Sequence, residues 1–213
     1  ALTSDFLQSE PGPAVDVQIV PFYPVSLTTP GGGSGTVSPA LASYLSNSVV
    51  TLTATPNSGW SFLRWEGDAA GTNNPLALTV NAPKTVRAIF GTPVARNVVG
   101  GGVVVFEPER AAYDFGSKLR AVAIPNAGAY FVVWSGALSG STNAQELTVT
   151  QPGQTVSALF TALAGNQVSL VVRSFGPGSV TITPYKNAYT LGEVARLEAV
   201  PADGTNQFLV WAG

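Results

Sequence analysis

The chain has 213 residues, of which 10 are basic and 12 acidic, and it contains no histidine, cysteine or methionine. The basic residues are scattered, so no positive stripe follows a phosphate backbone, and nucleic acid is excluded as a partner. No apolar run approaches the roughly 20 residues of a membrane-spanning helix, and the lack of cysteine excludes disulfides and thiol chemistry.

The first 22 residues are predicted to be the tail of a preceding repeat. Residues 11–19 (PGPAVDVQI) match residues 152–160 (PGQTVSALF), which close a later copy of a recurring pattern. In this tail Val15, Val17 and Ile19 alternate with other residues as in a strand, and they are candidate strand donors. Because the chain begins with Ala1 and on a partial repeat, we expect it to be a window from a longer array.

Repeat 1 is predicted over residues 23–91. Its segment 49–56 (VVTLTATP) alternates between apolar and polar residues, which places Leu52 on the inner face of a half-buried strand. A Pro-x-x-Gly turn at residues 56–59 predicts that the next strand, with FLRWEG at 62–67, returns antiparallel to it. An LTV segment at residues 78–80 and a closing strand complete the repeat.

The same landmarks return twice more, which predicts repeat 2 over residues 92–161 and an incomplete repeat 3 over residues 162–213. In each copy a proline precedes a tyrosine by five residues, a second proline follows twelve residues later, and a tryptophan follows nine or ten residues after that. The strand-and-turn composition predicts an all-β fold of tandem small antiparallel modules, β-grasp-like or sandwich-like, with about 70 residues per repeat.

Each repeat is small, so a single large aromatic side chain contributes much of its core. We therefore interpret the recurring aromatic residues as core positions rather than ligand platforms, and expect a bulge or the following glycine to let the paired Phe and Trp face the same core. The predicted core residues are Trp65, Trp134, Trp211, Phe62, Phe131, Phe208, Tyr44, Tyr113, Tyr189, Leu52 and Leu197.

No catalytic residue, metal ligand or cofactor site is predicted. Without His or Cys the common nucleophile–base pairs cannot form, and the acids occupy positions that differ between copies, as solvated surface charges do. Glu66 aligns with Ser135, and Asp114 aligns with Thr190. The glycine runs at residues 31–35 and 100–102 lack the Lys-Ser/Thr ending of a phosphate loop and are interpreted as flexible hairpin connections.

The polar loops after the first two tryptophans are the candidate contact surface if the protein binds a ligand. Nearby aromatic rings would add a face on which a sugar can stack. The candidate ligand contacts are Trp60, Tyr130, Asn73, Asn74 and Asn143.

The spacing V-x-L-x-A-x-P, G-x-x-F-x-x-W-x-G, L-T-V and V-x-A-x-F resembles the divergent internalin-type B-repeat of bacterial surface proteins. In repeat 1 the residues that carry it include Val50, Pro56, Phe62, Trp65 and Phe90. The resemblance implies a mostly β module, repeated in tandem on secreted or cell-surface proteins, with no catalytic residues. It leaves two functions open: a stalk, spacer or fibre-forming array whose partners are repeats of the same type, and a module that binds glycans or a cell surface. The incomplete repeat 3 leaves two interpretations open: head-to-tail assembly, in which one molecule donates a strand to the next, and a segment that is simply trimmed from a longer chain.

Overall fold

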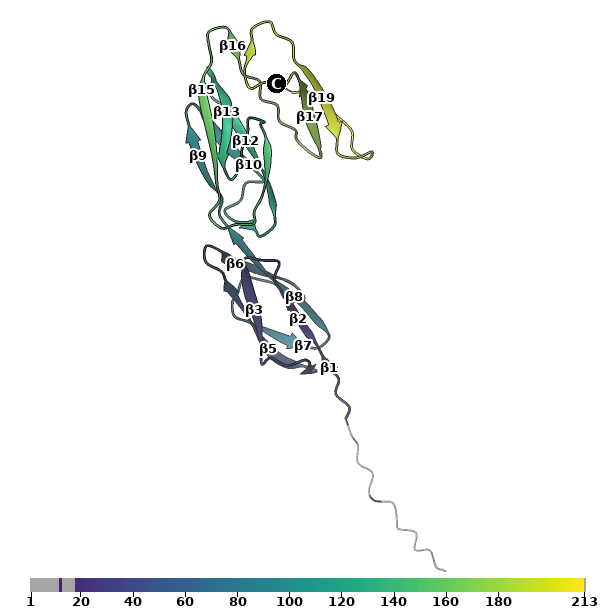
Figure 1. The fold of residues 1–213 in the computed structure, drawn as a ribbon. Coiled ribbons are helices and arrows are strands. Elements are labelled where there is room, and N and C mark those ends of the chain that lie inside the picture. Colours follow the sequence, from purple (N-terminus) through teal and green to yellow (C-terminus); the bar gives the residue numbers. More distant parts are fainter. Residues whose placement is uncertain (1–11, 13–17, 213) are drawn as a thin grey trace, which may run out of the picture.

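The structure, a computed structural model, describes residues 12 and 18–212. These residues form strands, turns and loops without a helix, so the predicted all-β class is confirmed. Repeats 1 and 2 lie end to end, and repeat 3 lies beside repeat 2 (Figure 1). No helix in the described part of the chain is long and apolar enough to cross a membrane.

Repeat 1 is a sandwich of two three-stranded sheets, with a further short pair at one end. One sheet has the order β3-β5-β7, and in the other β8 lies between β2 and β6. The strands are β1 (Phe22–Tyr23), β2 (Val25–Thr28), β3 (Gly33–Ser38), β4 (Tyr44–Leu45), β5 (Ser48–Pro56), β6 (Ser61–Gly67), β7 (Leu76–Val80) and β8 (Lys84–Thr92). Apolar side chains from both sheets fill the space between them.

Repeat 2 has the same plan. Its sheets have the orders β10-β12-β14 and β13-β15-β9. The strands are β9 (Ala95–Val99), β10 (Gly102–Glu107), β11 (Tyr113–Asp114), β12 (Lys118–Pro125), β13 (Ala129–Gly136), β14 (Gln145–Thr148) and β15 (Thr155–Ala162). Of the two architectures that the sequence left open, both complete repeats adopt the sandwich.

Two details of the pairing differ from the sequence-based expectations. The strand that carries FLRWEG does not return alongside the alternating strand, because β5 pairs with β3 and β7 whereas β6 pairs with β8. The Pro-x-x-Gly turn thus carries the chain from one sheet to the other. Repeats 1 and 2 also contain one parallel pair each, β2 with β8 and β9 with β15, in a fold that is otherwise antiparallel.

The glycine runs connect strands of opposite sheets and are closely packed rather than flexible. A Cβ atom on Gly33 would lie 2.6 Å from the ring of Phe90, and one on Gly102 would lie 2.5 Å from the ring of Phe160. Both distances are shorter than a side-chain contact allows. Glycine is required here because the core aromatic ring of the closing strand presses against the connection.

The tyrosine five residues after a proline closes a loop in all three repeats. The hydroxyl of Tyr44 donates to the carbonyl oxygen of Pro39 at 2.7 Å, and those of Tyr113 and Tyr189 donate to Pro108 and Pro184 at 2.9 Å. Each hydroxyl also accepts a backbone N–H, as from Leu41 to Tyr44 at 3.3 Å. The ring lies in the core while its polar end ties the loop, which accounts for the constant spacing.

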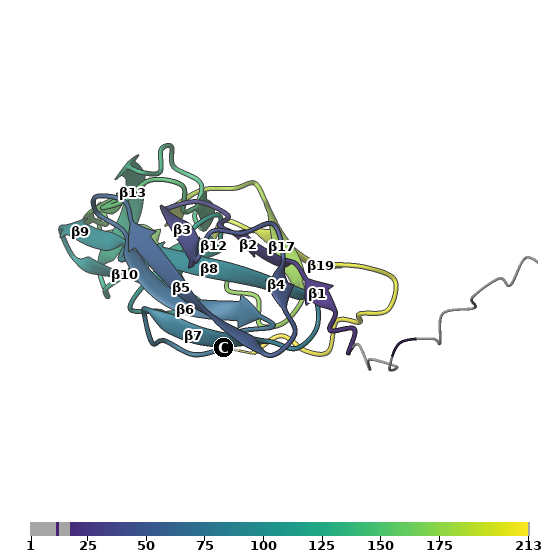
Figure 2. The ribbon, with the colours of Figure 1, turned by 90° about the horizontal axis from the view of Figure 1, so that it is seen from below.

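The segment predicted as repeat 3, residues 162–213, contains two short antiparallel pairs in its described part. Its strands are β16 (Gln167–Val168), β17 (Gly178–Thr183), β18 (Tyr189–Thr190) and β19 (Arg196–Pro201), paired as β16-β18 and β17-β19. Figure 2 looks nearly along the stacking direction of repeats 1 and 2 and shows β17 and β19 to one side of the strands of repeat 2. Tyr189 is buried, and Leu197 is half-buried.

Phe208 and Trp211 were predicted as core residues, but each is 46% exposed. Their rings contact each other, with centroids 4.9 Å apart, in the same way as the pairs of repeats 1 and 2. The physical reason for their exposure is the missing opposite strand. In repeats 1 and 2 the equivalent residues pair with β8 or β15, and the described part of repeat 3 offers no strand in that place.

Candidate functional site

The tryptophans of repeats 1 and 2 lie in the centre of their sandwiches. Trp65 is 2% exposed and Trp134 is 1% exposed. Register shifts between Phe62 and Arg64, and between Phe131 and Val133, show the bulge that brings each Phe and Trp to the same core. The ring centroids of Phe62 and Trp65 are 5.0 Å apart.

The loop after each tryptophan folds around the indole. The indole N–H of Trp65 donates to the carbonyl oxygen of Asn73 at 2.8 Å, and that of Trp134 donates to Thr142 at 3.0 Å. The backbone N–H of Trp65 donates to Gly71 at 2.9 Å, with an equivalent bond from Trp134 to Gly140. The polar groups of these loops therefore serve the fold, since they satisfy a buried donor that would otherwise be costly.

One asparagine of each loop is a clamp on the opposite sheet. The side-chain amide of Asn74 accepts the N–H of Ala54 at 2.9 Å and donates to its carbonyl oxygen at 2.7 Å. Asn143 binds Ala123 in the same way, at 2.9 and 2.6 Å. Each amide thus takes the place of a neighbouring strand, and this engages both polar groups of two candidate ligand contacts. Asn73 is exposed and contributes its backbone carbonyl to Trp65.

Repeats 1 and 2 share a strand at their junction, which we call the first joint. The end of β8 belongs to repeat 1 through the pairing of Gly91 with Ser61, and to repeat 2 through the pairing of Gly91 with Asp114 and of Thr92 with Tyr113. The N–H of Phe115 extends the contact by donating to the carbonyl oxygen of Phe90 at 2.9 Å. Because one strand is hydrogen-bonded to both repeats, the joint has no free linker.

Aromatic packing closes one side of the first joint. Trp60 of repeat 1 lies against Phe115 of repeat 2, with ring centroids 5.3 Å apart, and contacts both hydrophobic cores. The Phe115 ring also lies over the backbone of Gly31, where a Cβ atom would approach it to 2.5 Å. Trp60 is therefore half-buried in the joint instead of presenting a free ring to a ligand, whereas Tyr130 lies half-buried on β13.

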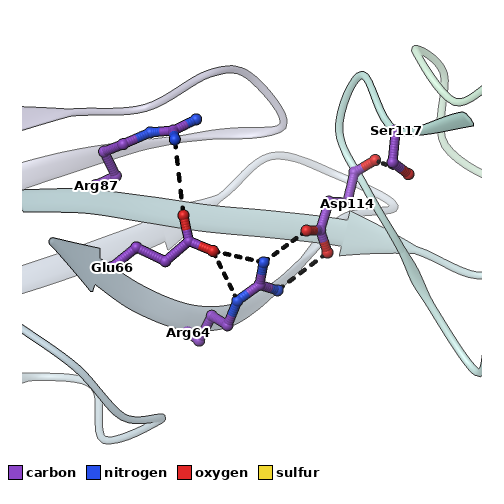
Figure 3. Close-up of polar contacts among 5 residues, drawn as sticks. All are labelled: Arg64, Glu66, Arg87, Asp114 and Ser117. Atoms are coloured by element: carbon purple, nitrogen blue, oxygen red, sulfur yellow. Dashed lines mark hydrogen bonds and ion pairs between the residues drawn. The ribbon is translucent and has the colours of Figure 1, made fainter. Parts of the chain in front are cut away.

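Ion pairs close another side of the joint (Figure 3). The guanidinium of Arg64 on β6 donates to both oxygens of Asp114 on β11, at 3.1 and 2.7 Å. The same guanidinium donates to Glu66 Oε1 from Nε at 3.0 Å and from Nη2 at 2.6 Å. These bonds raise the pKa of Arg64, and the bond from Arg64 lowers the pKa of Asp114 below its ordinary value of 3.8. Arg87 lies 3.7 Å from the second oxygen of Glu66.

These charged residues were interpreted from the sequence as solvated surface, and for Asp114 and Glu66 that interpretation is wrong. Asp114 is half-buried at the joint, and its side chain is 22% exposed. The two residues differ from their counterparts in the other repeats because the first joint differs from the second. When the repeats are compared, a position whose residue type varies is taken to have no role. A contact between two particular repeats nevertheless requires residues that the other repeats lack.

Thr92 is a buried polar residue at the same junction. Its hydroxyl donates to the carbonyl oxygen of Gly59 at 3.0 Å and accepts the N–H of Gly153 at 3.3 Å. One hydroxyl thus links a turn of repeat 1 to a turn of repeat 2. The pairing of both its donor and its acceptor explains why a threonine is tolerated in this buried position.

The second joint, between repeats 2 and 3, is built differently. Residues 163–166 separate β15 from β16, and hydrogen bonds and an ion pair link the two repeats. The N–H of Asn143 donates to the hydroxyl of Tyr185 at 2.6 Å, and Arg173 forms an ion pair with Glu107. Burial raises the pKa of the Tyr185 phenol. A cleft of about 640 Å³ lies between the repeats, lined by residues that include Arg120, Ser179 and Thr181.

Of the three candidate strand donors, the structure describes only Ile19. Val15 and Val17 lie outside the described residues, and Ile19 is exposed and in no strand.

A family model described as the divergent InlB B-repeat domain matches residues 25–94 and 92–164 in tandem. A search of curated proteins found no match. The family matches span both complete sandwiches and share residues 92–94, where the end of β8 enters repeat 2. Repeats of this family are generally structural rather than enzymatic. The resemblance seen in the sequence is confirmed: the chain belongs to the divergent InlB B-repeat family, whose repeats are modules of bacterial surface proteins.

Proposed function

We propose that the chain is a non-catalytic spacer of an extracellular or cell-surface protein, in which repeats 1 and 2 form one stiff unit. The observation that carries this proposal is the strand β8, which is hydrogen-bonded to both repeats without a linker between them. A spacer must resist bending, and the aromatic packing and ion pairs of the first joint lie beside this shared strand. Repeats of the same type are its partners within the array.

Small-angle X-ray scattering of the full chain tests the stiffness on which the spacer function depends. The unsubstituted chain is expected to give the distance distribution of an elongated particle. Combining Phe115→Ala with Asp114→Asn removes the ring and the charge that close the joint, so the distribution should become broader and shift to shorter distances. An unchanged distribution in the double variant would show that these two residues do not keep the first joint stiff.

Assembly by strand addition is a second part of the proposal. In repeats 1 and 2 the closing strand pairs antiparallel with the tryptophan strand and parallel with the first strand. In repeat 3 the described residues contain no such strand, and the rings of Phe208 and Trp211 are half exposed. A strand with the V-x-A-x-F pattern, supplied by another molecule, would cover both rings. Light scattering that gives a strict monomer at high protein concentration would refute this assembly.

Glycan or surface binding remains the alternative function, and the cleft at the second joint favours it. Its walls carry a carboxylate, a guanidinium and several hydroxyls, together with the phenol of Tyr185. Such polar groups beside an aromatic ring suit a sugar. The post-tryptophan loop contributes Thr142 and Asn143 to the wall. A glycan array with Tyr185→Ala as the comparison tests it: binding that disappears in the variant supports this function, and no binding by the unsubstituted chain refutes it.

A further inference from the structure

The first joint shows how the end of one repeat is covered by the next. Ile89 on β8 pairs with Arg64 and is only 3% exposed. It lines a small hollow together with Phe115, Gly116 and Ser117, the turn that follows β11 of repeat 2. This turn of the following repeat therefore covers the outer face of the preceding sheet.

The equivalent position on repeat 2 is open and carries apolar residues on all three strands of the sheet. Leu159 on β15 corresponds to Ile89 and is 39% exposed. In register with it lie Val99 on β9, 53% exposed, and Val133 on β13. These three residues form a row across one sheet, which we call the apolar row.

The turn of repeat 3 that corresponds to the covering turn is also open. Leu191 follows β18 as Phe115 follows β11, and it is 62% exposed. The charged partners of the first joint are replaced together, because Val133 stands in the place of Arg64 and Thr190 in the place of Asp114. The second joint thus lacks the counterparts of Arg64 and Asp114, and apolar side chains stand at Val133 on one side and Leu191 on the other.

We propose that the apolar row of repeat 2 is a docking surface for the turn Thr190–Gly192 of repeat 3, with Leu191 in the position that Phe115 takes at the first joint. Docking gives an end-to-end state that buries Leu159 and Leu191 against each other. The side-by-side state uses polar contacts instead, namely Tyr185 with Asn143 and Arg173 with Glu107. Residues 163–166, which lie between β15 and β16, are the segment in which the chain would change direction.

The biological use of this second state rests on the proposed spacer function, which it extends from a straight rod to a rod that bends at one joint. The docking itself depends only on the two apolar surfaces. Measurements on the second joint and on the first therefore report separately on the two proposals.

Pulsed EPR distances between paired spin labels test the docking in the full chain. Because the sequence has no cysteine, each pair of introduced cysteines is labelled alone. The test pair is Thr148→Cys with Val194→Cys, across the second joint. The reference pair is Thr79→Cys with Lys118→Cys, at the equivalent positions across the first joint. All four positions are exposed.

The test pair is expected to show two distance populations, one of them close to the single distance of the reference pair. Leu159→Asp and Leu191→Asp should each remove that population, since a buried carboxylate opposes docking, and Arg173→Ala should increase it at the expense of the other. Val49→Asp, an equally drastic change at an exposed position of repeat 1, should have no effect.

Two results would overturn the proposal. One is the absence of the reference-like population from both the unsubstituted chain and R173A. The other is its persistence in both aspartate variants. A broad distribution in the reference pair would instead refute the stiff first joint, so the failure of the spacer function can be told apart from the failure of the docking.

Discussion

Arg64 and Asp114 belong to different repeats, 50 positions apart in the chain, and they meet through two parallel hydrogen bonds of 3.1 and 2.7 Å. Two-point contact fixes the orientation of the two groups as well as their distance. Because Glu66 holds the same guanidinium from within repeat 1, Arg64 is already aligned before repeat 2 contributes its carboxylate. The pair therefore acts on the angle between the repeats more than on the stability of either one.

Replacing Asp114 with Asn is expected to lower the free energy of unfolding by at most about 1 kcal/mol at pH 7, because the pair is partly exposed. Since the folded-state pKa of Asp114 is lowered, its contribution is complete above the ordinary value of 3.8 and is lost as the pH falls through the folded-state pKa. Urea unfolding of both proteins across this range should show curves that converge in acid. Glu146→Gln, which removes the exposed pair with Lys118, is the control. A loss at pH 7 no larger than that of the control would contradict the role of Asp114.

Trp65→Phe is expected to destabilise repeat 1 by about 2 kcal/mol. The change leaves a cavity in the core and removes the hydrogen bond from the indole N–H to the carbonyl oxygen of Asn73. Trp211→Phe is the matched control because that ring is half exposed, and it should cost less than about 0.5 kcal/mol. The midpoints of chemical unfolding measure both. Equal losses in the two variants would mean that repeat 3 has a core like the others.

Asn74→Ala should cost about 1–3 kcal/mol, because the N–H and carbonyl groups of Ala54 both lose their partner. The neighbouring change Asn73→Ala should cost little, since Asn73 contributes only its backbone oxygen to Trp65. Thermal unfolding of the two variants distinguishes the residues. A larger loss of stability in N73A than in N74A would contradict the role given to the Asn74 side chain.

Tyr113→Phe removes the hydroxyl that ties the Pro108 loop, at an expected cost of about 1 kcal/mol at pH 7. Burial raises the pKa of Tyr113 above its ordinary value of 10.0, so its contribution is complete below that value and disappears as the pH rises through the folded-state pKa. The difference in the free energy of unfolding between the unsubstituted chain and Y113F should therefore disappear in strong alkali. Tyr130→Phe serves as the control, since Tyr130 lies half-buried on β13, outside the loop that Tyr113 closes. A gap between the unsubstituted chain and Y113F that persists in strong alkali would argue against this linkage.

The spacing of the repeated residues was enough to predict the class of fold and the repeat. Recurrence marks positions on which every copy depends, such as Trp65 and its bulge, or the tyrosine that ties a proline loop. The crossing from β5 to β6 was not predictable in this way. A Pro-x-x-Gly turn specifies a change of direction, and only the packing of two sheets decides whether the next strand pairs locally or with β8.

The residues of the first joint were missed for the opposite reason. Arg64, Asp114 and Phe115 have no counterpart of the same type in the other repeats, because each joint is a contact between two particular neighbours. The signal in the sequence was that repeat 1 alone has a basic residue at position 64 and repeat 2 alone has an acidic residue at position 114. Recognising it requires knowing that β11 lies beside the end of β8, which the sequence does not state.

The shared strand predicts that repeats 1 and 2 tumble as one body, and backbone ¹⁵N relaxation of the full chain measures this most directly. Amides of residues 23–91 and 93–161 should report the same overall rotational diffusion tensor, with Gly91 and Thr92 as rigid as the strands on either side. Separate and faster tumbling of the two repeats, with increased mobility at Gly91 and Thr92, would contradict the stiff joint.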